Sequence, residues 1–266
     1  MTEEIIWQTA IGLQQVDDLK PSAYLLEIAK QHFAGDITIA EAKGRIEDYY
    51  KAAPVRRTTS EDRTVEADEV SVRIAEILSE NTFSFSPAEY LNIHRRLFVG
   101  IYEFAGKIRD YNITKSEHVL NGDTVTYAGA DYLSATLEHD FAKERKFSYK
   151  GLTQIHTIEH IARFISDLWQ VHPFGEGNTR TTAVFLIKYL RELGFKNIND
   201  TFAQHSLFFR NALVRANYQN IINNIHSTNM YLEHFLRNLL LDENLTLRNE
   251  ELHIYYGAPA EFQPMP

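Results

Sequence analysis

Apolar residues recur at helical spacing near the start of the chain, with polar capping residues ahead of them. Ser22 precedes apolar positions 25, 26, 28 and 29, and Thr38 and Glu41 form a capping-box pair before the next apolar run. This pattern predicts a helical hairpin over residues 20–50. We therefore expect a small helical domain over residues 1–52.

The rest of the chain predicts a larger helical body. Ser86-Pro87 supplies a cap and a first-turn proline ahead of residues 88–98. Residues 152–171 have the apolar periodicity of a buried helix, and residues 181–193 are apolar on most faces and stop at Gly194, a natural helix end. The expected order is a helical N-terminal domain, a charged linker, the main domain and an irregular tail, at residues 1–52, 53–69, 70–241 and 242–266.

Residues 118–127 depart from this helical pattern. Asn121-Gly122 stands between two short β-type runs, and this pair is a strong hairpin signal because both central residues of a type I′ turn need positive φ. Two strands alone are only marginally stable, so we expect a surface flap rather than part of the core. The predicted fold class is all-α with a β-hairpin flap.

Composition narrows the class of protein and its compartment. The 266 residues carry a formal net charge of −9, which argues against a basic surface for nucleic acid. The sequence contains no cysteine, so disulfides and thiolate metal sites are excluded and a cytoplasmic location is the simplest expectation. No apolar run has the length of a membrane span, and the first residues predict no signal peptide. We therefore expect neither nucleic-acid nor membrane partners.

The densest cluster of candidate functional residues is VHPFGEGNTR, residues 171–180, between two apolar predicted helices. Pro173 cannot continue the first helix, which places His172 at a helix end. Gly175 and Gly177 allow the backbone to approach a ligand closely. A glycine-bearing turn that opens a helix points its N–H groups outward, where they suit an anion such as phosphate.

The charged residues of this cluster fit phosphate chemistry. Arg180 adds a fixed charge and a fork of donors in the first turn of the second helix. Glu176 is a hard oxygen ligand of the kind that Mg²⁺ takes when phosphates supply the other ligands. His172 would be a base beside the phosphate, and the whole set matches in-line transfer from a nucleotide. A plain turn with solvated charges would use the same residue types, so chemistry alone leaves both interpretations open.

The spacing of HPFGEGNTR resembles the signature of the Fic/Doc family, H-x-F-x-D/E-G-N-G-R-x-x-R. The matching positions are His172, Phe174, Glu176, Gly177, Asn178 and Arg180. The segment IYEFAGKIRDYNITK, residues 101–115, is similar to the family's approach to its target-binding flap. Residues 9–50 are similar to the small helical antitoxin that pairs with some Fic toxins. The resemblance covers about residues 70–240.

The resemblance implies a Fic-type helical bundle that transfers AMP from ATP to a Ser, Thr or Tyr hydroxyl of a protein, or of the chain itself. His172 would take the proton of that hydroxyl, and Glu176 would hold Mg²⁺ on ATP. The flap side chains expected against the target are Val119, Leu120 and Val125. The residues expected around the nucleotide are Gly175, Gly177, Asn178, Thr179, Arg180 and Tyr218.

Two positions depart from the family pattern and keep alternatives open. Thr179 stands where the last glycine belongs, and Ala183 stands where the second arginine belongs. Because the resemblance assigns that arginine to the γ-phosphate, the alternatives are Doc-like phosphoryl transfer, other nucleotidyl transfer, and a non-catalytic nucleotide-binding interaction protein. Many Fic proteins also carry an inhibitory glutamate, and Glu80 is the candidate here. The sequence names neither the target nor the oligomeric state, and a homo-oligomer stays open.

Overall fold

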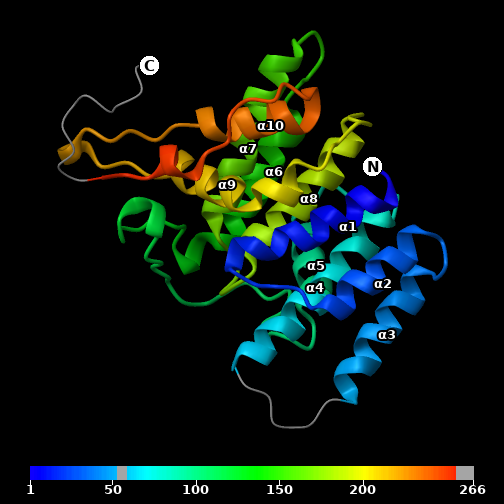
Figure 1. The fold of residues 1–266 in the computed structure, drawn as a ribbon. Helices are drawn as coiled ribbons and strands as arrows, with labels where there is room; N and C mark the ends of the chain where they lie inside the picture. Colours follow the sequence, from blue (N-terminus) through cyan, green and yellow to red (C-terminus); the bar gives the residue numbers. More distant parts are fainter. Residues whose placement is uncertain (53–58, 256–266) are drawn as a thin grey trace.

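The computed structural model describes residues 1–52 and 59–255, and these residues form a helical bundle (Figure 1). No strand occurs among them, so the all-α prediction is confirmed for this part of the chain. The α-helices are α1 (Glu3–Gly12), α2 (Ala23–Phe33), α3 (Ile39–Lys51), α4 (Thr59–Ser79), α5 (Pro87–Phe98), α6 (Leu133–Lys146), α7 (Gln154–Val171), α8 (Asn178–Glu192), α9 (Thr201–Ala216) and α10 (Met230–Leu241). The short 3-10 helices are η1 (Leu13–Asp17), η2 (His118–Leu120), η3 (Ala130–Tyr132), η4 (Ile221–Asn223) and η5 (Asn249–Leu252).

The predicted caps set the starts of several helices. The Ser22 hydroxyl accepts the Leu25 N–H at 3.0 Å and so opens α2. Thr38 and Glu41 form both bonds of a capping box at the start of α3. These side chains supply acceptors for N–H groups that have no partner inside the helix.

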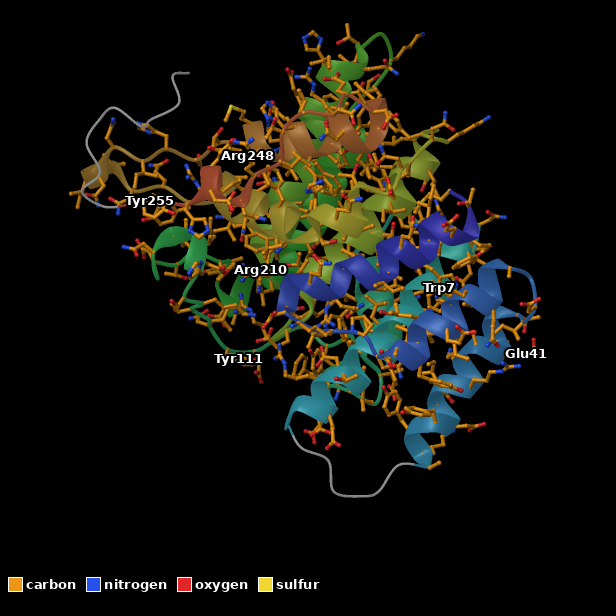
Figure 2. All side chains as sticks on the ribbon, viewed as in Figure 1. Trp7, Glu41, Tyr111, Arg210, Arg248 and Tyr255 are labelled. Atoms are coloured by element: carbon orange, nitrogen blue, oxygen red, sulfur yellow. The ribbon has the colours of Figure 1, made fainter. Side chains whose placement is uncertain are left out.

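The N-terminal helices share one core with the rest of the molecule. Trp7 of α1 is 1% exposed, and its indole donates to His32 of α2 at 2.9 Å (Figure 2). At the other end of α1, a Cβ on Gly12 would lie 2.5 Å from the carbonyl oxygen of Phe202 in α9. The backbones of α1 and α9 therefore approach closely, and buried residues of both belong to one continuous hydrophobic cluster.

Part of the expected linker is helical. α4 begins at Thr59, so the described part of the 53–69 segment, residues 59–69, forms the first three turns of this helix, while residues 53–58 lie outside the described residues. The segment is polar because one face alone meets the core, where Ala67 is fully buried. The neighbouring Asp68 accepts hydrogen bonds from Ser22 and Tyr50, which anchors the hairpin of α2 and α3 to α4.

Residues 112–128, here called the flap segment, do not form the expected pair of strands. Asn121 and Gly122 have φ values of 54° and 89°, as the turn signal required. However, the turn closes on itself, with Gly122 N–H donating to the Glu117 carbonyl at 3.0 Å. The Ile254 N–H donates to the Val119 carbonyl at 2.9 Å, so this segment is hydrogen-bonded to the backbone of the tail. Packing against the body and the tail replaces cross-strand pairing, consistent with the low stability of an isolated hairpin.

The described part of the tail, residues 242–255, is irregular apart from η5 and packs on the body through the fully buried Leu252. Residues 256–266 lie outside the described residues. Within the described chain, no helix combines the length and apolarity needed to cross a bilayer.

Candidate active site

His172 lies at the end of α7 in a confined position. It adopts left-handed backbone angles, φ 50° and ψ 57°, and caps the helix by donating its N–H to the Trp169 carbonyl. The residue is 3% exposed, and neither ring nitrogen has a hydrogen-bond partner among the described residues. Its imidazole instead packs between two aromatic rings, with centroids 4.2 Å from Tyr127 and 5.3 Å from Trp169. An imidazole whose nitrogens have no hydrogen-bond partner can accept a proton from a bound substrate.

The surroundings of His172 favour its neutral form. Burial lowers the pKa of this imidazole well below 6.5, and the nearby cations Lys115, Arg109 and Arg210 lower it further. The His172 ring is therefore unprotonated at pH 7 and can accept a proton.

The loop of residues 172–177, here called the motif loop, is shaped by side chains of its own neighbourhood. The Asn178 amide donates to the Phe174 carbonyl at 2.8 Å and accepts the Phe174 N–H at 3.1 Å. Gly177 precedes α8 at φ 78°, and a Cβ there would lie 2.4 Å from the Phe98 ring. Only glycine fits both the angle and the space at this position.

His94 of α5 holds the motif loop from the other side. Its Nδ1 accepts the Gly106 N–H at 2.8 Å, so Nε2 carries the proton and donates to the Glu176 carbonyl at 3.0 Å. Its ring stacks on Phe174 with centroids 3.6 Å apart. Burial lowers the pKa of His94 to about 4, which keeps this tautomer neutral.

Arg109 joins the motif loop to both ends of the flap segment. Its guanidinium donates to the carbonyls of His172 at 2.9 Å, Tyr111 at 2.5 Å and Ala128 at 2.6 Å. Its backbone N–H donates to the Pro173 carbonyl at 2.9 Å. The planar fork of arginine thus satisfies three carbonyls at once and fixes the flap segment beside His172.

Glu176 could hold a metal ion only if a bound phosphate compound and water supplied the other metal ligands. Its side chain is 54% exposed, and its Oε2 lies 2.9 Å from the Lys115 ammonium of the flap segment. The described residues contain no cluster of three or more His, Asp or Glu side chains suited to a metal. A single accessible carboxylate fits Mg²⁺, which usually takes one or two carboxylates and completes its shell with phosphate oxygens and water.

Arg180 points away from the motif loop and into the contact with the N-terminal region. It is 1% exposed, and its guanidinium lies 4.8 Å from the centre of the Phe98 ring. Its polar partners are Gln14 at 3.1 Å, Asp17 at 2.9 Å and Glu66 at 2.7 Å. Two carboxylates neutralise this buried cation, as burial of a charge requires.

Three further residues are expected to contact the nucleotide, and the structure places them in different surroundings. The Thr179 hydroxyl accepts the Trp169 indole N–H at 3.0 Å, so it faces the core. A Cβ on Gly175 would lie 2.7 Å from the Tyr111 hydroxyl, so the loop backbone passes close to the residue that precedes the flap segment. Tyr218 is 3% exposed and donates to Asp123 at 2.6 Å.

The three flap side chains expected against the target are all inside the molecule. Their exposed fractions are 1% for Val119, 0% for Leu120 and 2% for Val125. In the described conformation, contact of these side chains with a target would require the segment to move.

Glu80 lies beside the later turns of α8. Its carboxylate pairs with Arg96 at 2.5 Å, and its carbonyl accepts from Lys188 at 2.5 Å. Lys188 follows Arg180 by eight residues, about 12 Å along the helix axis. The structure therefore does not bring the Glu80 carboxylate to the motif loop.

Sequence patterns did not single out several residues that shape this site. They are His94, Arg109, Lys115, Tyr127 and Arg210. None belongs to the 171–180 motif, and although Arg109, Lys115 and Tyr127 lie in the segments expected to lead to and form the flap, no pattern predicts their contact with the motif. The tertiary fold brings them close to His172 and Glu176.

A model of the Fic/DOC family matches residues 84–190, which contain α5, the flap segment, α7 and the motif loop. These residues are a Fic/DOC family domain. The chain is similar to protein adenylyltransferase VbhT of Bartonella schoenbuchensis, at 30% identity over 103 residues, 39% of this chain and 20% of the relative. It is also similar to the probable protein adenylyltransferase y4lH of Sinorhizobium fredii, at 28% identity over 128 residues, 47% of this chain and 61% of the relative.

A solved structure shares the fold of the Fic domain. It is the N-terminal FIC domain of the Bep8 protein, a VirB-translocated Bartonella effector protein from Bartonella sp. 1-1C. The TM-score is 0.54 at 18% identity, with 73% of this chain and 92% of that chain covered. The two curated relatives are matched over only 20% and 61% of their own lengths.

Proposed function

We propose that this chain is a protein adenylyltransferase that moves AMP from ATP to a Ser, Thr or Tyr hydroxyl of a protein. The buried, unpartnered imidazole of His172 carries the proposal, because it stands as a neutral base at the end of a loop with the Fic signature. The adenylyltransferase names of the two curated relatives support AMP as the transferred group.

The reaction needs one proton transfer and one exchange at phosphorus. The target oxygen would attack the α-phosphorus of ATP while its proton passes to a ring nitrogen of His172. The bond from the α-phosphorus to the bridging oxygen would break, and pyrophosphate would leave. Mg²⁺ on Glu176 would supply positive charge to the phosphates. The first-turn N–H groups of α8 lack helical acceptors and would face phosphate oxygens.

The contact of Arg180 with the N-terminal region supports self-inhibition as part of the proposal. A guanidinium held by Gln14, Asp17 and Glu66 is unavailable to phosphates. Displacing residues 1–17 from the body would remove Gln14 and Asp17 and leave Glu66 of α4 as the carboxylate partner of Arg180. The carboxylates that restrain the site would then be Asp17 and Glu66. Glu80 contacts α8 at Lys188, too far from Arg180 to act on it directly.

The test is transfer of label from ATP to protein. With α-labelled ATP and Mg²⁺ we expect label on a protein substrate or on the chain itself, and loss of more than a hundredfold of it in His172→Ala, because general-base catalysis contributes about 10²–10⁴-fold. Label from γ-labelled ATP would instead show phosphoryl transfer. Tight ATP binding without any transferred label would identify a non-catalytic nucleotide-binding protein.

A further inference from the structure

Three cations surround the unpartnered imidazole of His172, and they differ in how firmly they are held. Arg109, Arg210 and Lys115 all lower the pKa of that ring by their charge, so the His172 ring lies in a positive potential. Such a potential attracts anions. The question is which of the three is able to bind one.

Arg109 and Arg210 are already committed to the fold. Arg109 is 6% exposed and donates to three carbonyls, all of which would lose their donor if it moved. Arg210 lies 2.7 Å from Glu117, a carboxylate only 1% exposed (Figure 2 shows Arg210 on the side of the flap segment). Removing the cation would leave a buried negative charge uncompensated, which is costly.

Lys115 is less buried than Arg109, and its ion-pair partner is more exposed than that of Arg210. Its side chain is 26% exposed and sits on a flexible stem, and its ion-pair partner in the described residues is the half-exposed Glu176. Exposed pairs of this kind contribute little free energy, so the pair exchanges easily. Glu176 is also the carboxylate expected to bind Mg²⁺, so the Lys115 ammonium contacts the carboxylate that the metal would use.

Building on the proposed function, we propose that Lys115 is a phosphate-binding residue whose availability is controlled by the metal. Without a divalent cation, Lys115 neutralises Glu176. With Glu176 engaged by Mg²⁺, the Lys115 ammonium would lose its carboxylate partner and would be free to bind the phosphate chain of ATP. The chain thereby gains a phosphate-binding cation from the flap segment while Arg180 is held by Asp17 and Glu66 and position 183 is alanine.

The test is ATP binding measured by calorimetry, with a non-hydrolysable ATP analogue so that turnover plays no part. With Mg²⁺, Lys115→Met should weaken binding about tenfold, the loss expected for one charge-assisted hydrogen bond. Lys115→Arg keeps the charge and should retain most of the affinity. Lys146→Met, at the exposed end of α6, is the matched control and should bind as the wild type does.

A second comparison, in EDTA, tests the exchange. Glu176→Gln releases Lys115 and should strengthen metal-free ATP binding, and Glu176→Gln combined with Lys115→Met should lose that gain. If Lys115→Met binds ATP with Mg²⁺ as tightly as or more tightly than the wild type, Lys115 merely competes with the metal and the inference is overturned while the proposed function stands. Absence of ATP binding by the wild type removes both.

Discussion

At the scale of single residues, the chemistry depends on an imidazole kept neutral by its surroundings. Burial and three nearby cations oppose a positive charge on His172, while Tyr127 and Trp169 hold the ring without a hydrogen bond to either nitrogen. The orientation of the base is therefore set by packing, and its protonation is set by charge. A bound polyphosphate would offset those cations.

This balance predicts how His172 titrates. In the free protein its midpoint, followed by ring-carbon NMR and assigned by its absence in His172→Gln, should lie well below 6.5. ATP binding should move the midpoint upward, because phosphate charge favours the imidazolium. The unfolded chain takes up this proton first, so the contribution to folding stability is lost as the pH falls through 6.5, at no more than about 1.4 kcal/mol per pH unit. A midpoint near 6.5 that ATP leaves unchanged would contradict the electrostatic account.

At the scale of elements, the site is a junction between α7, α8 and the flap segment. Asn178 closes the motif loop, His94 supports it from α5, and Arg109 ties it to the flap segment through three carbonyls and one backbone bond. The backbone hydrogen bonds inside the flap segment lie within the turn around Asn121, so contacts such as those of Arg109 position the segment against the motif loop.

We therefore expect Arg109→Lys to loosen the flap segment despite conserving charge. A lysine cannot reach three carbonyls arranged for a planar fork, and each buried acceptor left without a donor costs about 1–3 kcal/mol. The unfolding free energy should fall by about 2 kcal/mol, and amide hydrogen exchange should rise across residues 111–128. Arg95→Lys, an exposed change on α5, is the control. Unchanged exchange in this segment would show that other contacts hold it.

At the scale of the whole molecule, the N-terminal helices and the Fic domain are one folded body. α1 approaches the backbone of α9 at Gly12, and η1 and α4 together neutralise Arg180 at the start of α8. The state of the site is thereby coupled to the docking of the N-terminal region.

Asp17→Asn combined with Glu66→Gln tests that coupling. Both substitutions keep shape and remove charge, so the buried Arg180 loses its counterions and the unfolding free energy should fall by about 3 kcal/mol. If this contact restrains the site, affinity for ATP should rise at the same time, measured by calorimetry under conditions where the variant is folded. Glu80→Gly, which removes one of the two carboxylates beside Arg96, should leave ATP affinity unchanged. Reduced stability with unaltered ATP affinity would make the contact purely structural.

The sequence by itself determined the local features of this protein. Ser22, Thr38 and Ser86 open helices because a short hydroxyl side chain meets the N–H groups of its own first turn. Pro173 ends α7, and Gly177 allows the positive φ before α8, so the motif loop was visible from residue types and spacing. Each of these outcomes depends on interactions within a few residues.

Tertiary structure decided where side chains point and what they meet. The flap segment gave up its expected strands because the body and the tail offered better contacts than a two-stranded hairpin. Asn178 and Thr179 turned to Phe174 and Trp169, and Arg180 turned to the N-terminal region. Such outcomes compare partners far apart in the chain, and their free energies depend on burial and distance, which no local pattern contains.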